Sequence, residues 1–193
     1  MKAEHYFYKC SKEYLNAIDP NLYNEIIEVI SILPKRQTQA EINYDLFWLL
    51  TAKGWSFDTF PSSLPNTPPS GLGLGNTALS EIRTRNNRDL CRTSTTINAT
   101  WHSDFAKGYD KGLVQIEAQF GKVESMFKDF CGFKIANHER RLALGIEVVL
   151  SQPNRYFTHR KSAISGMAYF DIAQTTLPSI GLDCPIWLLG ISE

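Results

Sequence analysis

The sequence lacks the usual marks of a membrane, secreted or zinc-binding protein. None of its apolar runs approaches the length that spans a bilayer, and its first fifteen residues hold no uninterrupted apolar signal segment. Its 4 cysteines lie far apart and form no C-x-x-C pair, so neither a zinc site nor a disulfide framework is indicated. We therefore expect a cytoplasmic protein with reduced thiols and no membrane partner.

The chain also lacks net charge, since 20 Lys and Arg residues face 20 Asp and Glu residues. Any electropositive surface must therefore be local. The 4 histidines show no H-E-x-x-H spacing and no G-x-S-x-G occurs, so a zinc protease or a serine hydrolase is not supported. The glycines at 71, 73 and 75 have no Lys-Ser/Thr after them and no strand before them, which predicts a flexible loop rather than a nucleotide site.

What the sequence does contain is typical of one globular domain over residues 1–193, with 43% hydrophobic residues. Apolar spacing predicts helices at 18–33, 39–55, 123–136 and within 163–177, and strands at 100–105, 113–120, 142–150 and 184–192. Strands that alternate with helices in this way predict an α/β fold, with a central mixed sheet flanked by helices. Asp19 is expected to cap the first helix, with Pro20 in its first turn.

Residues 60–98 interrupt this pattern with a long segment that is first rich in Pro, Gly and Ser and then rich in arginine. Loops of this length are usually functional or disordered. The arginines of this segment could bind phosphate oxygens, which guanidinium groups suit well. Alternatively, they form a solvated face whose charge Glu81 and Asp89 partly neutralise. The arginines concerned are Arg83, Arg85, Arg88 and Arg92.

Two acidic side chains flank a predicted hairpin, with 106–112 as its turn. Glu117 and Gln119 emerge on the same side of an apolar strand, and across an antiparallel hairpin Asp104 can converge on Glu117. Converged carboxylates repel unless a divalent cation lies between them, and oxygen ligands favour Mg2+, which can polarise a phosphoryl oxygen. The alternative is a half-buried hairpin with one polar face, which Gln115 on that face favours.

The Asp-Phe pair at 104–105, followed by IEAQFGK at 116–122, resembles type II restriction endonucleases of the Bgl II and BstY I group. This group lies within the PD-(D/E)xK nuclease superfamily. Other segments are similar too, so the resemblance covers most of the chain outside 60–98. These segments are IDPNLYNEIIEVI (18–30), LTAKGW (50–55), LGIEVVL (144–150), SAISGMAYFD (162–171) and CPIWLLGIS (184–192).

The resemblance implies a restriction-endonuclease-like fold and a homodimer that cuts double-stranded DNA with Mg2+. The relatives cut sites with a GATC core and leave four-base 5′ overhangs. Asp104 and Glu117 match the metal-binding carboxylates, and Gln119 takes the place of the usual lysine, where it can orient the attacking water. Asp58, three residues after Trp55, falls where the group has a further polar residue of the active site.

The resemblance also implies DNA contacts. Lys122 and Ser165 match positions that contact base edges, and Arg160 and Lys161 beside them are candidates for base or phosphate contact. Arg83 and Arg85 in the long segment are further candidates for DNA binding.

Two departures from the group leave alternatives open. The turn after Asp104 is longer than in the relatives, so Asp110 competes with Asp104 as the first carboxylate. The segment 60–98 is also longer, which leaves the recognition sequence open.

Alternative functions are a DNA-binding protein of the same fold that has lost cleavage, and a nonspecific, repair or junction-resolving nuclease. The helices at 18–33 and 123–136 are candidate dimer surfaces.

Overall fold

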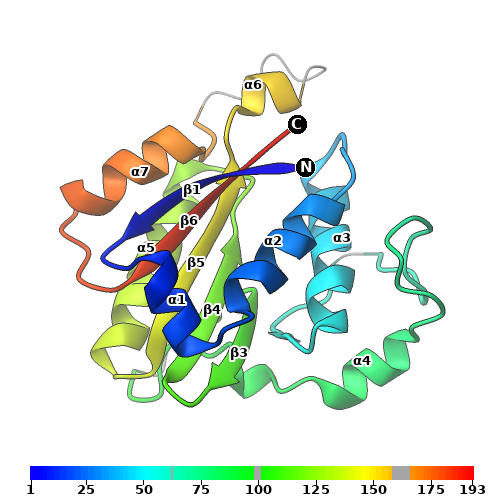
Figure 1. Ribbon diagram of the computed structural model, residues 1–193, viewed down its shortest axis with the longest axis horizontal. Helices are drawn as coiled ribbons and strands as arrows, with labels where there is room; N and C mark the ends of the chain where they lie inside the picture. The colour runs from blue at the N-terminus through cyan, green and yellow to red at the C-terminus, as the bar shows by residue number, and fades with distance from the viewer. Residues whose placement is uncertain (62, 98–100, 158–165) are drawn as a thin grey trace.

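The computed structural model describes residues 1–61, 63–97, 101–157 and 166–193 around a six-stranded mixed sheet (Figure 1). The strand order is β1-β6-β5-β4-β3-β2. The central strands β4, β5 and β6 run parallel, and the other pairs are antiparallel. The strands are β1 (Lys2–Tyr8), β2 (Ser56–Phe57), β3 (Phe105–Tyr109), β4 (Gly112–Ala118), β5 (Leu142–Leu150) and β6 (Ile186–Ser192).

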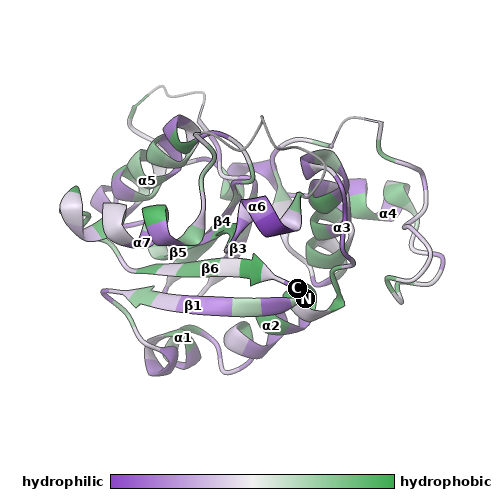
Figure 2. Cartoon of the chain, turned by 90° about the horizontal axis from the view of Figure 1, so that it is seen from above, coloured by the Kyte–Doolittle hydropathy of each residue, from purple (hydrophilic) through white to green (hydrophobic). Residues whose placement is uncertain are grey.

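Helices cover both faces of the sheet. Figure 2 shows α5 and α7 on one side of β1 and β6, with α1 and α2 on the other. The α-helices are α1 (Lys12–Ile18), α2 (Leu22–Ile32), α3 (Gln39–Ala52), α4 (Leu79–Arg85), α5 (Val123–His138), α6 (Pro153–Tyr156) and α7 (Phe170–Ser179). Within the described ranges, no helix has the length and apolar character that crossing a bilayer requires.

Each face of the sheet carries its own apolar core. Alternate residues of β5, such as Leu144 and Ile146, pack with α2 and α3, whereas Val149 packs with α5 and α7. All nine residues of β5 are buried, as expected for a central parallel strand that is covered on both sides. The α/β architecture predicted from the sequence is therefore confirmed, as is the strand predicted at 142–150.

Several predicted boundaries are wrong. The helix predicted at 18–33 is α2, which begins only at Leu22, because Asp19 is the C-cap of α1 rather than an N-cap, and its side chain accepts a hydrogen bond from the backbone N–H of Asn21, the N-cap of α2. The turn predicted at 106–112 is mostly strand β3, and the chain reverses at Asp110, with Gly112 at φ 126°. The segment 60–98 contains α4 and a short 3-10 helix, η1 (Arg88–Leu90).

A glycine in β5 allows α5 to lie close to the sheet. A Cβ atom at Gly145 would lie 2.7 Å from Cδ1 of Ile186 and 2.9 Å from the ring of Phe133. Phe133 is itself buried in the core, where it packs in the cluster on this face of the sheet. Because Phe133 and Asp129 are one turn apart on α5, the same close approach brings Asp129 to the sheet.

Replacing Gly145 with alanine should therefore lower the free energy of unfolding by about 1–3 kcal/mol, the usual cost of overpacking. Gly108→Ala is the matched control, because the nearest atom to a Cβ there is 4.0 Å away. This control should be neutral or slightly stabilising. Urea unfolding of the two variants tests the difference, and equal stabilities would contradict this account of how α5 is placed.

Candidate active site

Asp104 and Glu117 are held together at one end of the β3–β4 hairpin. The register pairs Phe105 with Ile116, so Asp104 and Glu117 are the next residues along the two chains. The backbone N–H of Asp104 donates to Oε2 of Glu117 at 3.2 Å, and Oδ2 of Asp104 accepts from the N–H of Ala118 at 2.9 Å. Each carboxylate is thus bonded to the other's segment, which fixes both at the same end of the hairpin.

Both carboxyl groups are poorly suited to carry their charge without a cation. Burial raises the pKa of Glu117 well above its ordinary value, and repulsion from Asp104 and Asp129 raises it further. Desolvation by the surrounding protein also raises the pKa of Asp104, and the Asp58 charge adds to this effect, but the increase is limited because Asp104 is exposed to solvent. Opposing this, one hydrogen bond from a backbone N–H stabilises each charged form.

Two further acids, missed by the sequence analysis, complete the cluster. Glu147 on β5 pairs in register with Glu117, is 0% exposed, and neither of its oxygens has a hydrogen-bond partner among the described residues. Burial raises its pKa well above the ordinary value, with added repulsion from Asp129, Glu117 and Asp104. A lone acid within the apolar run LGIEVVL was the signal for Glu147, because buried glutamates are rare unless paired.

Asp129 lies on the buried face of α5, three residues after Met126 and one before Phe130. An acid at a helix position that the apolar spacing assigns to the core was the signal for this residue. Its Oδ2 accepts a hydrogen bond from Nε2 of Gln119 at 3.1 Å. Burial raises the pKa of Asp129 to about 6.

Gln119 follows β4 and links the strand to α5. Besides donating to Asp129, it accepts a hydrogen bond at Oε1 from the N–H of Gly121 at 2.9 Å. One hydrogen of the amide group remains for another acceptor. Gln115, which points to the same side of the strand, makes only long contacts of 3.5 Å to the carbonyl oxygens of Leu90 and Cys91.

Asp58 lies beside Asp104 on the neighbouring strand, and its N–H donates to the carbonyl oxygen of Asp104 at 3.1 Å. Its Oδ1 accepts from Nε of Arg88 at 2.6 Å, and its Oδ2 accepts from the hydroxyl of Thr59 at 2.8 Å. Partial burial acts to raise the pKa of Asp58, but the hydrogen bonds from Arg88 and Thr59 outweigh it and keep that pKa below the ordinary value. Nδ1 of His102 lies 3.7 Å from Oδ1 of Asp58.

The competing carboxylate, Asp110, lies at the opposite end of the hairpin. Tyr109 pairs with Gly112, so Asp110 sits in the turn, whereas Asp104 adjoins the pair formed by Phe105 with Ile116. The residues after Asp104 that were predicted as a long turn instead form strand β3 and its pairing with β4, and only Asp110 and Lys111 form the turn. The structure therefore brings Asp104, not Asp110, to Glu117.

Three of the six residues predicted to contact DNA lie within the described residues, and they lie in different parts of the fold. Lys122 is exposed at the N-terminus of α5, where residues 121–123 pair with 166–168. Arg83 stacks over the ring of Phe60 at 4.7 Å, and Nε of Arg85 donates to the carbonyl oxygen of Glu81 in its own helix. The remaining three predictions lie outside the described residues: Arg160, Lys161 and Ser165.

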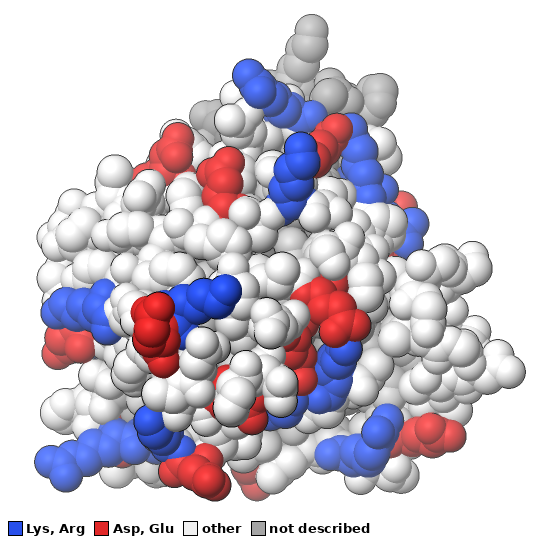
Figure 3. Space-filling model, viewed as in Figure 1, with Lys and Arg blue, Asp and Glu red and all other residues white. Residues whose placement is uncertain are grey.

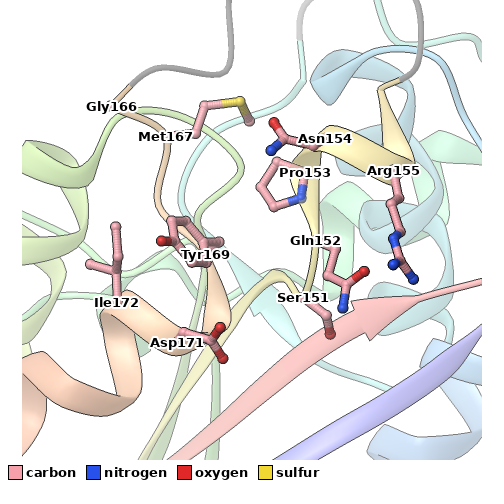
Figure 4. A pocket seen from close by; sticks show the side chains of 10 residues that line it. All are labelled: Ser151, Gln152, Pro153, Asn154, Arg155, Gly166, Met167, Tyr169, Asp171 and Ile172. Carbon is pink, nitrogen blue, oxygen red and sulfur yellow. The ribbon is translucent and has the colours of Figure 1, made fainter.

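Two hollows lie near this end of the sheet. One of about 270 Å³ adjoins Asp104 and is lined by Asn43 and Tyr44 of α3 and by Phe60. The larger, of about 690 Å³, lies beyond the end of β5, with residues 151–155 on one side and 166–172 on the other (Figure 4). On the face drawn in Figure 3, basic and acidic side chains are intermixed, in keeping with the zero net charge.

The donor set fits a hard divalent cation that keeps much of its water. Among the described residues, no three His, Cys, Asp or Glu side chains are arranged to hold one metal ion. The protein therefore offers the pair Asp104 and Glu117, and Mg2+ is typically bound by one or two carboxylates. A cation there would also relieve the repulsion that raises the pKa of Glu117.

The pKa of Asp129 gives a testable dependence of stability on pH. Its folded pKa of about 6 lies above the ordinary value of 3.8, so the protonated acid favours folding. This contribution is fully present below about pH 4 and is lost as the pH rises through about 6, to a total of about 3 kcal/mol. Asp129→Asn removes the charge and keeps an acceptor for Gln119, so it should exceed wild type in stability at pH 8 and match it near pH 4.

Urea unfolding at both pH values measures this effect. Asp183→Asn is the control, because the hydrogen bond from Lys134 lowers the pKa of Asp183 and the sign is reversed. That variant should gain nothing at pH 8. If Asp129→Asn showed no gain at pH 8 over wild type, the unfavourable burial of the Asp129 charge would be disproved.

Comparison with known proteins assigns the chain to a family. The model of the family described as restriction endonuclease BglII/BglIII matches residues 3–191, nearly the whole chain. No curated protein matches the sequence. The mixed sheet with helices on both faces agrees with a restriction-endonuclease-like fold. The chain thus belongs to the BglII/BglIII family of restriction endonucleases, and it is a DNA-binding hydrolase, a type II site-specific deoxyribonuclease.

Proposed function

We propose that this endonuclease uses Mg2+ to cleave a short palindromic site in duplex DNA, with an active site of the PD-(D/E)xK type. The observation that supports this most directly is the pair of bonds joining Asp104 and Glu117 across the hairpin, at 3.2 and 2.9 Å to backbone N–H groups. Two acids held side by side with a raised pKa suit a cation that draws them into their charged forms.

In this proposal Asp104 and Glu117 hold the ion. When bound, Mg2+ supplies charge stabilisation and polarises a phosphoryl oxygen. Gln119 orients the attacking water through the amide hydrogen that Asp129 does not use. Asp58 is a further polar residue of the site, next to Asp104.

The reaction is a hydrolysis without any redox change. The oxygen of water bonds to phosphorus as one P–O ester bond breaks on the opposite side. The water gives up a proton toward solvent, and the departing oxygen of the sugar takes one up. Asp104 and Glu117 hold the cation in their charged forms. Gln119 fixes the direction from which the water approaches phosphorus.

We propose a homodimer, because two-fold protein symmetry would match a palindromic site. Of the two candidate surfaces, α5 exposes Phe127, which lines one hollow together with Ile180, whereas α2 exposes Ile32 and buries Leu22, Ile26, Val29 and Ile30. A site with a GATC core is the working proposal for recognition. The proposed DNA contacts are Lys122, Ser165, Arg160, Lys161, Arg83 and Arg85.

Plasmid digestion with Mg2+ tests this function. Wild type should give discrete fragments, while Glu117→Gln and Asp104→Asn should lower the cleavage rate at least about 100-fold, because each removes a charge from the cation site. Asp110→Asn is the matched control at the other end of the hairpin and should cut like wild type.

Other outcomes point elsewhere. A smear would indicate a nonspecific nuclease, and a gel shift without cutting would indicate a binding protein. Full activity of Glu117→Gln would refute the site assignment, and loss of activity in Asp110→Asn alone would move the first carboxylate to that residue. Sequencing the fragment ends shows whether the site has a GATC core.

A further inference from the structure

The charges around the candidate active site do not balance. Asp104, Glu117, Asp129 and Glu147 lie close enough to repel one another, and Gln119 brings no charge. A DNA phosphate adds one more negative charge, and its hydrolysis spreads charge over the nonbridging oxygens. A cation supplied by the protein would therefore stabilise the transition state at this place.

Arg88 brings such a cation to this end of the sheet. Its Nε donates to Oδ1 of Asp58 at 2.6 Å, and Asp58 is in turn bonded through its N–H to the carbonyl oxygen of Asp104 at 3.1 Å. Lys128 also influences this cluster, through Asp129, but it lies on the exposed side of α5. Arg88 is thus linked through Asp58 to the backbone of Asp104, one of the two residues of the proposed cation site.

The segment that carries Arg88 is fixed to the sheet. The side chain of Asn86 accepts from the N–H of Phe57 at 2.9 Å and donates to its carbonyl oxygen at 3.1 Å. The N–H of Asn87 donates to the hydroxyl of Ser56 at 3.2 Å. Three bonds to β2 therefore precede Arg88, which holds its backbone in place although it belongs to the long segment 60–98.

Most hydrogen-bond donors of the Arg88 guanidinium remain available to bind another group. Its bond to Asp58 uses Nε, and the two terminal nitrogens make no hydrogen bond within the described residues. The side chain is 62% exposed, and exposed ion pairs contribute little to stability. A role in folding therefore explains the arrangement poorly, whereas a fork of donors suits the oxygens of a phosphate.

We propose that Arg88 is a catalytic residue that contacts the scissile DNA phosphate through its terminal nitrogens, while Asp58 is the positioning residue that aims it. This inference rests on the proposed function. The guanidinium stays protonated throughout, forms no covalent bond, and balances charge on the nonbridging oxygens as water attacks. Asp58 then acts through Arg88 and need not bind the metal ion.

The test measures two quantities on one synthetic duplex that contains the cleavage site. The first is the single-turnover cleavage rate with Mg2+ and saturating protein, and the second is the Kd without divalent metal. Arg88→Gln should lower the rate by about 100-fold or more and change the Kd by less than about tenfold. Arg140→Gln, in the exposed turn at the other end of β5, is the matched control and should change neither.

Adding Gln119→Lys separates a charge effect from a structural one. A lysine at position 119 places an ammonium group beside Asp129, inside the acidic cluster. If Arg88 supplies needed positive charge, Arg88→Gln should lower the rate at least about tenfold less in the Gln119→Lys background than in the wild-type background, a comparison that cancels the effect of losing Gln119 itself. Equal losses in the two backgrounds would overturn the inference, as would an Arg88→Gln rate within about threefold of wild type.

Thermal melting checks that each variant is folded. Should Arg88→Gln fail to fold, Arg88→Lys keeps the charge but loses the fork of donors, so it is expected to lower the rate by about tenfold or more, and a folded Arg88→Lys within about threefold of wild type would overturn the inference. A wild type that never cuts would overturn the proposed function together with this inference. A wild type that cuts beside an unimpaired Arg88→Gln would overturn this inference alone.

Discussion

Two glutamates buried side by side on neighbouring parallel strands, Glu117 and Glu147, are the constraint on which this structure depends. Burying an uncompensated charge costs several kcal/mol, and within the described residues neither carboxyl oxygen of Glu147 has a hydrogen-bond partner. The strands stay in register because apolar cores on both faces of the sheet outweigh this cost. The packing thus holds the carboxyl groups of Glu117 and Glu147 at one end of the sheet, where a hard divalent cation would stabilise their charged forms.

The other parts of the site reach this end from distant places in the sequence. Gly145 lets α5 lie close to the sheet, and α5 carries Asp129 to the amide group of Gln119. On the opposite edge, the bonds between Asn86 and Phe57 hold the segment that carries the guanidinium of Arg88. Acidic side chains on or next to β2, β3, β4, β5 and α5 therefore gather at this end of the sheet, where the guanidinium of Arg88 bonds to one of them, Asp58.

Local patterns in the sequence predicted the strand that carries Glu117 and a hairpin that brings Asp104 beside it, but the strand predicted at 100–105 is wrong, because β3 is Phe105–Tyr109, most of which was predicted as a turn. The edge strand β1 was missed, since KAEHYFY mixes polar and aromatic residues and pairs only with β6 at the far end of the chain. The contact between Asp58 and Arg88 spans thirty residues and rests on the three-dimensional path of 60–98, which no periodicity encodes. Glu147 and Asp129 were visible as solitary acids in apolar patterns.

Calorimetric titration of the DNA-free protein with Mg2+ tests the central claim most directly, because cation binding must expel protons from acids whose pKa is raised. Measured near pH 6 in two buffers with different heats of ionisation, binding should release protons. Near pH 9 this release should shrink, and Asp104→Asn should abolish most of the binding. Mg2+ binding that releases no protons near pH 6, or that survives unchanged in Asp104→Asn, would contradict the claim that Asp104 and Glu117, whose pKa values are raised, form a cation site.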